Sequence, residues 1–236
     1  MIARFPKIIP FQISPPTLAL GQIHLMVASL ESLAKHREQL YAVLNEEEQT
    51  RAQRFINAAH GDNFRLVRGA LRVCLGNYLS LPAETIRFTF NQYGKPEIDS
   101  AQNPRALRFN VSHSHHMAAF IFTLGKCVGI DIEFIKPLRN MHGLVKHVCG
   151  PRELEEFNAL DIEERREAFF RLWTRKEAFI KAKGQGLSMG LRTIYIGFDT
   201  NRPARPVQYR DHWLDNWLVK DLDCDAHYKL AVAVET

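Results

Sequence analysis

The stretch FRLWTRKEAFIKAKGQGL, residues 170–187, decides the fold of this chain because it has the pattern of a helix with one acid among its aromatic residues. Residues three and four apart lie on one side of a helix. An apolar stripe of this kind consists of Phe169, Leu172, Trp173 and Ile180. Glu177 lies at the edge of this stripe, where an ionised carboxylate costs several kcal/mol unless a cation or a set of donors meets it. The sequence therefore predicts that a cation or a set of hydrogen-bond donors faces Glu177.

Length and composition limit the class of protein. With 236 residues, 46% of them hydrophobic, the chain can bury the core of two small lobes or of one elaborate domain. Its four cysteines are scattered without a CxxC pair, so we expect neither a zinc site nor a disulfide framework. No apolar run approaches the ~20 residues of a membrane span, and the N-terminal segment lacks a signal-peptide core. We therefore expect a soluble, cytoplasmic protein without a membrane partner.

The net charge of +5 favours an anionic partner, such as nucleic acid, a phosphorylated small molecule or an acidic protein. The chain has no continuous run of Lys and Arg of the kind found in nucleic-acid-binding tails. A solvated basic surface explains the same excess equally well, so charge alone does not select one class of partner.

Hydrophobic periodicity predicts alternating groups of strands and helices. Strands are expected at 21–30, 85–90, 107–114, 117–123, 127–133, 191–200, 206–214 and 227–235. Helices are expected at 45–55, with Asn45 as the N-cap, and at 60–79, 138–148, 151–159 and 163–183. The strands 117–123 and 127–133 are predicted to form a hairpin through Gly125 and Lys126. Each half of the chain thus has the elements of an α+β lobe, and we place the lobes at residues 1–118 and 119–236.

The motif GIDIE, residues 129–133, places two acids on one predicted strand. Asp131 and Glu133 are two residues apart, so both carboxylates project from one face. A divalent cation relieves the repulsion between them, and oxygen ligands specify a hard ion such as Mg²⁺. The alternative is a solvated strand end. Glu177 is a third carboxylate in need of a cation, so one metal ion would satisfy all three acids.

Two further groups of residues allow more than one interpretation. Lys181 follows Glu177 by one helical turn, so it could form an ordinary ion pair or point past the metal at a phosphate. His113, His115 and His116 lie on or beside a predicted strand and could suggest a transition metal. No fourth ligand stands at a suitable spacing, so we do not expect zinc.

Four motifs together resemble one enzyme family. VGIDIE (128–133), followed 44 residues after Glu133 by the glutamate of WTRKEAFIKAKGQGL (173–187), resembles the (V)GxDxE and WxxKEAxxK signatures of the Sfp-type 4'-phosphopantetheinyl transferases. QYGKPEI (92–98) and FNVSHS (109–114) look like the two motifs that precede them in this family. The likeness covers roughly residues 90–187, and RAQRF (51–55) and FRLVRGALR (64–72) extend it more weakly.

The resemblance implies a fold and a reaction. The expected fold is α+β, with two similar lobes related by a pseudo-twofold axis and coenzyme A in the cleft between them. In the expected reaction, a serine hydroxyl of an apo acyl or peptidyl carrier protein attacks the β-phosphorus of the coenzyme A pyrophosphate, and 3',5'-ADP leaves. By analogy with the family, Asp131, Glu133 and Glu177 would be the Mg²⁺ ligands of an enzyme that acts as a monomer.

The resemblance also implies roles for other residues. Lys181 would lie beside the pyrophosphate, and Glu153 would deprotonate the serine, although an acid is also common in the first turn of a helix that opens with proline. The residues that match the coenzyme A site are Arg51, Arg65 and Lys95 for the 3'-phosphate, and Ser112 and His113 for the nucleotide phosphates. Glu48 departs from the family, in which this position is often lysine, and this puts one phosphate contact in doubt.

Two rival functions remain to be weighed. A metal-dependent 3'–5' exonuclease also uses an Asp-x-Glu pair and could employ Asp161, Tyr195 and Asp199, but 191–200 alternates like a strand and Glu177 would have no role. A non-enzymatic RNA-binding module could use Arg65, Arg68 and Arg72, but no RNA-binding signature is present and three acids would repel the phosphate backbone. We therefore expect no nucleic-acid partner.

Overall fold

The computed structural model describes residues 8–200 and 205–236, which divide into two compact units. The N-terminal unit contains the described residues up to Thr89, together with Pro96–Gly125. The C-terminal unit contains Phe90–Lys95 and Lys126–Thr236. The boundary expected between residues 118 and 119 falls inside a strand, whereas the compact units change at Gly125.

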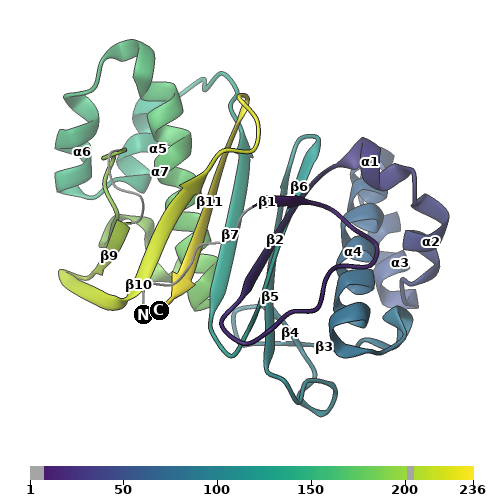
Figure 1. The fold of residues 1–236 in the computed structure, drawn as a ribbon. Coiled ribbons are helices and arrows are strands. Elements are labelled where there is room, and N and C mark those ends of the chain that lie inside the picture. Colours follow the sequence, from purple (N-terminus) through teal and green to yellow (C-terminus); the bar gives the residue numbers. More distant parts are fainter. Residues whose placement is uncertain (1–7, 201–204) are drawn as a thin grey trace. The chain divides into compact units, whose positions relative to one another are not determined.

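The N-terminal unit has a four-stranded sheet with the order β1-β2-β6-β5 (Figure 1). Its strands are β1 (Ile8–Pro10), β2 (Ile23–Ser29), β5 (Leu107–Ser114) and β6 (Met117–Leu124). Strand β1 is parallel to β2, and the remaining pairs are antiparallel. A separate two-stranded sheet consists of β3 (Phe88–Phe90) and β4 (Pro96–Ile98).

Helices supply the second layer of the N-terminal unit. They are α1 (Leu30–Ala34), α2 (Arg37–Ala42), α3 (Glu46–Gln53) and α4 (Ala58–Leu79), with short 3-10 turns at Ala83–Thr85 and Ser100–Gln102. The predicted cap of α3 is confirmed, because the Asn45 side chain accepts a hydrogen bond from the Glu48 amide and the Glu48 carboxylate accepts one from the Asn45 amide. The apolar face of α4 packs with the strands in one core.

The C-terminal unit has a five-stranded antiparallel sheet with the order β7-β11-β10-β9-β8. Its strands are β7 (Val128–Phe134), β8 (Ile194–Tyr195), β9 (Arg205–Tyr209), β10 (His212–Leu222) and β11 (Tyr228–Glu235). The predicted hairpin between residues 117–123 and 127–133 is wrong. Strand β6 already has β2 and β5 on its two edges, and β7 pairs with β11 instead.

Three helices belong to the C-terminal unit: α5 (Met141–Val148), α6 (Pro151–Asn158) and α7 (Ile162–Lys183), followed by 3-10 turns at Gly186–Met189 and Leu191–Thr193. Helix α7 has 22 residues and packs on β7 and β11. Each unit is therefore an α+β layer pair in which a 22-residue helix covers a sheet. None of the helices in the described part of the chain is long and apolar enough to cross a membrane.

Candidate functional site

Strand β7 and helix α7 meet at a glycine. A Cβ atom on Gly129 would collide with the carbonyl oxygen of Ala178 and would lie 2.5 Å from the amide nitrogen of Ala182. The absence of a side chain therefore lets α7 rest directly on the strand. Alternate residues of a strand project from the same face. Asp131 and Glu133 consequently project to the side on which α7 lies, as Gly129 does.

Glu177 is the acid that α7 contributes to this site. The pKa of Glu177 is raised to about 7; burial is the largest cause, the charges of Asp131 and Glu133 also raise it, and the charge of Lys181 lowers it. Its Oε1 atom is buried and has no hydrogen-bond partner among the described residues. The carboxylate of Glu177 therefore lies near two other acids without enough positive charge to offset it, as the sequence indicated.

Lys181 supplies the cation nearest to these acids. Its Nζ atom lies 2.6 Å from Oδ1 of Asp131, and the Asp131 side chain is only 4% exposed. The Lys181 side chain is 29% exposed, so its ammonium group keeps contact with solvent. The charge of Lys181 thus partly neutralises the cluster, and its exposure leaves it able to meet an anion as well.

The donor chemistry of this cluster fits a hard divalent cation. Three carboxylates face one region, and the buried Oε1 atom of Glu177 has no hydrogen-bond partner among the described residues. Hard cations prefer carboxylate oxygen ligands. Within residues 8–200 and 205–236, no three His, Cys, Asp or Glu side chains are already arranged at metal-binding distances. The side chains as described therefore have the right chemistry for such an ion but would have to move to hold it.

Glu153 occupies a different environment from these acids. It is 1% exposed and forms a buried ion pair with Lys176, which also donates to the carbonyl oxygens of Val148 and Leu191. The Glu153 carboxylate also accepts hydrogen bonds from the backbone amides of Gly150 (3.2 Å) and Ile196 (3.1 Å). A general base needs an acceptor oxygen within reach of the substrate proton. Both carboxylate oxygens of Glu153 already accept hydrogen bonds in this structure.

Comparison with known proteins identifies the family. Residues 127–233 match the family model of the 4'-phosphopantetheinyl transferase superfamily, and residues 31–122 match that of the 4'-phosphopantetheinyl transferase N-terminal region. The 4'-phosphopantetheinyl transferase HetI of Nostoc sp. is 35% identical over 222 residues, which span 93% of this chain and 91% of HetI. The chain belongs to the 4'-phosphopantetheinyl transferase superfamily. Sfp of Bacillus subtilis (strain 168) is 27% identical to this transferase over 198 residues, which span 84% of this chain and 85% of Sfp.

Membership of this family confirms the expected reaction class. The protein is a transferase that carries the phosphopantetheine group of coenzyme A to carrier proteins. The exonuclease and RNA-binding alternatives are thereby displaced. The structure agrees, because Tyr195 lies in strand β8, where its hydroxyl donates to Glu156 (2.7 Å), rather than on a helix one turn from Asp199.

Arg51 and Arg65, which we expect to bind phosphate, lie in the N-terminal unit of the transferase. The Arg51 guanidinium lies 5.2 Å from the centre of the Phe64 ring. Arg65 donates to Asp62 at 2.8 Å and to Gln49 at 3.3 Å. Both guanidinium groups are therefore held by neighbours on α3 and α4.

Glu48 pairs with two arginines of α4. Its side chain accepts a hydrogen bond from Arg72 at 2.6 Å, and Arg68 lies 3.6 Å away. Burial lowers the pKa of Arg68, and the charges of Arg51 and Arg72 lower it further. Glu48 thus neutralises a crowded group of arginines.

The two predicted residues on β5 have different surroundings. Ser112 is buried, whereas His113 is exposed. Consecutive residues of a strand project to opposite faces, so Ser112 and His113 do not share one face of the sheet.

The predicted site residues are divided between the two units. The C-terminal unit contains Asp131, Glu133, Glu177, Lys181, Glu153 and Lys95, and the N-terminal unit contains Arg51, Arg65, Ser112 and His113.

Sequence reasoning missed two buried cations of α7. Lys176 pairs with Glu153, as described above, and Arg175 forms a two-point ion pair with Asp221, with distances of 2.9 and 2.6 Å. Both cations are 0% exposed. The sequence indicated such cations, because apolar residues occur on more than one face of α7. Some of the charged residues of this helix therefore had to be buried and paired.

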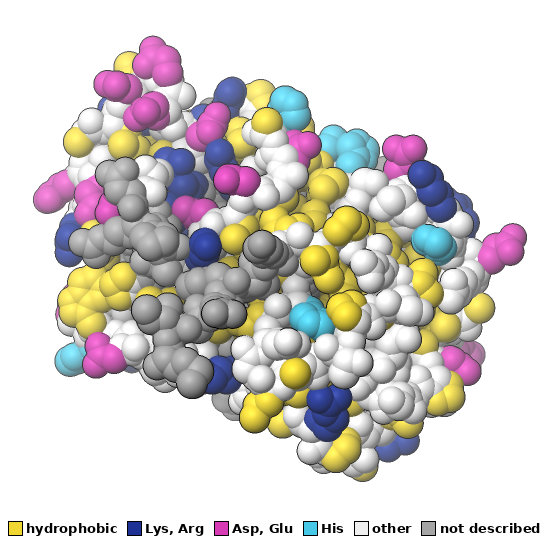
Figure 2. All heavy atoms as spheres, in the orientation of Figure 1, with side chains coloured by type: hydrophobic (Ala, Val, Ile, Leu, Met, Phe, Trp, Pro, Cys, Tyr) yellow, Lys and Arg dark blue, Asp and Glu magenta, His cyan; other side chains and the backbone are white. Residues whose placement is uncertain are grey.

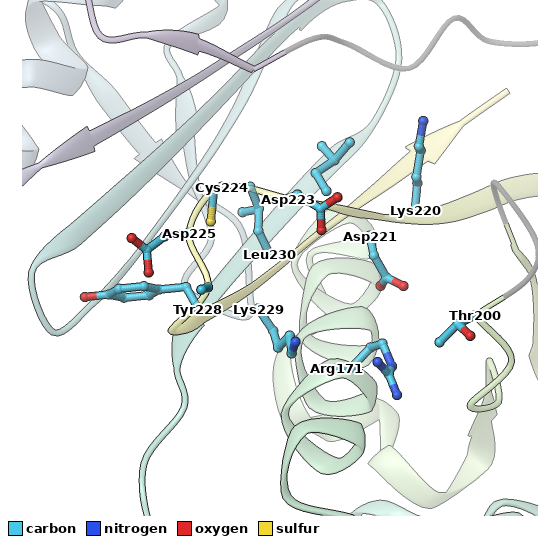
Figure 3. A pocket seen from close by; sticks show the side chains of 12 residues that line it. Arg171, Thr200, Lys220, Asp221, Asp223, Cys224, Asp225, Tyr228, Lys229 and Leu230 are labelled. Carbon is cyan, nitrogen blue, oxygen red and sulfur yellow. The ribbon is translucent and has the colours of Figure 1, made fainter. Parts of the chain in front are cut away.

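A cavity of about 780 Å³ lies elsewhere on the C-terminal unit, between α7 and the β10–β11 connection (Figure 3). Its charged lining residues are Arg171, Lys220, Asp221, Asp223, Asp225 and Lys229. Two of these charges are already paired, since Asp221 binds Arg175 and Lys229 binds Glu167 at 2.8 Å. None of the predicted site residues lines this cavity. Its mixed charges do not indicate one class of ligand.

Basic and acidic side chains are interspersed on the face of the molecule drawn in Figure 2. Lys and Arg side chains occur there singly or in small groups rather than in one continuous basic area.

Proposed function

We propose that this transferase depends on Mg²⁺ held by Asp131, Glu133 and Glu177, and that it modifies a serine of apo acyl or peptidyl carrier proteins. The observation that supports the metal most strongly is the buried Oε1 atom of Glu177, which has no hydrogen-bond partner among the described residues. Two neighbouring acids raise the pKa of Glu177 in addition to burial. A protein that kept three acids together without a cation would lose stability at neutral pH.

The chain contributes charge and position to the reaction. When bound, Mg²⁺ would offset the negative charge of the pyrophosphate, which is the main requirement of phosphoryl transfer. Lys181 would leave Asp131 and place its ammonium group beside a phosphate oxygen, as its partial exposure allows. Arg51, Arg65 and Lys95 are our candidates for the 3'-phosphate of coenzyme A. Ser112 and His113 are candidates for the other nucleotide phosphates.

We assign Glu153 to positioning rather than to proton transfer. Its carboxylate ties the start of α6 to Lys176, the residue immediately before Glu177 on α7. Loss of that ion pair would leave a charged group buried without a partner, which typically costs more than the pair contributes. Glu153 would thus act on catalysis through the placement of α7.

The carrier protein is expected to be acidic, and helix α5 is our candidate for its docking surface. Leu144 is 38% exposed on this helix, and Lys146 and His147 lie in its last turn. Carrier proteins are acidic helical bundles as a class, so the net charge of +5 would speed their association.

A mass-shift experiment tests the proposed function. The protein is incubated with coenzyme A, Mg²⁺ and a panel of apo carriers, and each carrier is examined for the gain of one phosphopantetheine group. We expect modification of at least one carrier, its loss in excess chelator, and its return when Mg²⁺ is added back. Full activity of the chelated enzyme, or of Glu177→Gln, would refute the metal assignment.

A further inference from the structure

The turn between β3 and β4 is fastened to the end of helix α7 by two side chains. The Asn91 amide nitrogen donates to the carbonyl oxygen of Gly184 at 2.8 Å, although the two residues are 93 positions apart. The Lys95 ammonium donates to the carbonyl oxygen of Ala182 at 3.1 Å. The other end of the Asn91 side chain organises the turn itself, because Oδ1 accepts from the amides of Tyr93 (2.9 Å) and Lys95 (3.0 Å).

These contacts occur where the helix most needs donors. The last carbonyl groups of a helix have no partner within it, and this end carries the negative pole of the helix dipole. Helix α7 ends at Lys183, and its C-cap Gly184 has a φ of +70° and donates its amide hydrogen to the carbonyl oxygen of Ile180. An amide and an ammonium group from a distant segment therefore complete the C-terminal cap of α7.

Gly184 is also required by the close approach of the turn. A Cβ atom at this position would lie 2.9 Å from Cδ of Lys95 and 3.0 Å from Nδ2 of Asn91. The turn therefore packs directly on the helix end. Phe90–Lys95 belongs to the C-terminal unit for this reason, whereas the residues on both sides of it, Thr89 and Pro96, belong to the N-terminal unit.

We infer that Asn91 is a positioning residue for phosphopantetheine transfer, which holds the Asn91–Lys95 turn on the helix that carries Glu177 and Lys181. The inference rests on the proposed function, in which Lys95 meets coenzyme A and the acids of β7 and α7 hold the cation. Glu177 and Gly184 are seven residues apart, or about 10 Å along the helix axis. One rigid helix thus fixes the coenzyme A turn at a set distance from the metal-binding acid.

Asn91→Asp removes the hydrogen bond to Gly184 and keeps the hydrogen bonds within the turn. Aspartate keeps an oxygen that accepts from the Tyr93 and Lys95 amides, but it lacks the nitrogen that donates to Gly184. It also places a negative charge against the carbonyl end of α7. Gly184→Ala is a second variant, which pushes the turn away from the helix side while leaving Asn91 unchanged.

Asn103→Asp provides a matched control. Asn103 also bridges a turn, since it accepts from the Leu107 amide at 2.7 Å and donates to the Leu107 carbonyl at 3.0 Å. Its substitution by aspartate removes a comparable hydrogen bond, but in a loop of the N-terminal unit. General effects of a lost turn contact on stability should appear in this control.

We expect Asn91→Asp and Gly184→Ala to raise the KM for coenzyme A by about two- to tenfold, the effect of one lost hydrogen bond. The KM for the apo carrier should stay at the wild-type value, and Asn103→Asp should leave both KM values unchanged at a similar loss of Tm. A purely structural role would lower the Tm without this selective change. The inference is overturned if both test variants keep the wild-type KM for coenzyme A.

The activity of the wild-type enzyme shows whether a negative result refutes the proposed function or only the positioning role of Asn91. If it modifies a carrier and Glu177→Gln does not, then unchanged KM values in Asn91→Asp and Gly184→Ala refute the positioning role alone. If wild-type protein transfers no phosphopantetheine to any apo carrier, the proposed function fails and the positioning role fails with it.

Discussion

Replacement of Glu177 by glutamine should stabilise the protein at alkaline pH in the absence of divalent cations. The pKa of this glutamate is raised from the usual 4.5 to about 7 in the folded protein. Between these two pH values the folded protein binds a proton that the unfolded chain has released. The resulting stabilisation is fully present below pH 4.5 and is lost as the pH rises through 7.

The size of the effect follows from the same pair of values. A pKa that is higher by about 2.5 in the folded state corresponds to about 3 kcal/mol as an upper limit. Solvent reaches part of the Glu177 side chain, and screening reduces the figure to about 1–2 kcal/mol. Glutamine has nearly the same shape and does not titrate in this range, so Glu177→Gln should gain this amount relative to wild type at pH 8.

Urea denaturation in the presence of chelator, from pH 4.5 to pH 8, measures the difference directly. The free energies of unfolding of wild type and Glu177→Gln should converge at pH 4.5 and separate as the pH rises. Glu155→Gln, a change at an exposed position of α6, serves as the control and should follow the wild-type curve. Equal stability of wild type and Glu177→Gln at pH 8 would refute the claim that this carboxylate lies in an unfavourable environment.

Three further predictions concern neighbouring parts of the structure. Lys95→Ala should raise the KM for coenzyme A more than that for 3'-dephospho-coenzyme A in steady-state assays; an equal rise would leave Lys95 with only its contact to α7. Gly129→Ala should cost about 3 kcal/mol in urea denaturation and lower kcat, because a methyl group there collides with the backbone of Ala178; a wild-type midpoint would contradict the close packing. Glu153→Gln should cost about 3–5 kcal/mol by leaving the Lys176 charge buried, and the residual kcat should keep the wild-type pH profile; disappearance of the acidic limb of that profile in the variant would restore its role as base.

Local signals in the sequence predicted much of the fold and of the acidic cluster. Asn45 is recognisable as a helix cap because the capping residue and its partner are three positions apart. The unfavourable position of the Glu177 carboxylate could be predicted, because helical periodicity alone places this residue beside an apolar stripe. Its neighbours Asp131 and Glu133 belong to a short motif whose alternation fixes the face from which they project.

Features that depend on distant partners were not accessible in the same way. The hairpin prediction failed because the pairing of β6 with β2 depends on a strand almost one hundred residues earlier, and local alternation carries no information about it. The burial of Glu153 depends on Lys176, 23 residues away, and a first-turn acid looks the same whether it is exposed or paired. The contact between Asn91 and Gly184 spans 93 residues and required the folded chain.

Binding of Mn²⁺, a spectroscopic substitute for Mg²⁺, tests the central claim most directly. Electron paramagnetic resonance of the protein with coenzyme A should show one bound Mn²⁺ ion that Mg²⁺ displaces, and Glu177→Gln should lose this signal. Mn²⁺ binding of equal strength in wild type and in Glu177→Gln would contradict the assignment of the three acids to one metal ion.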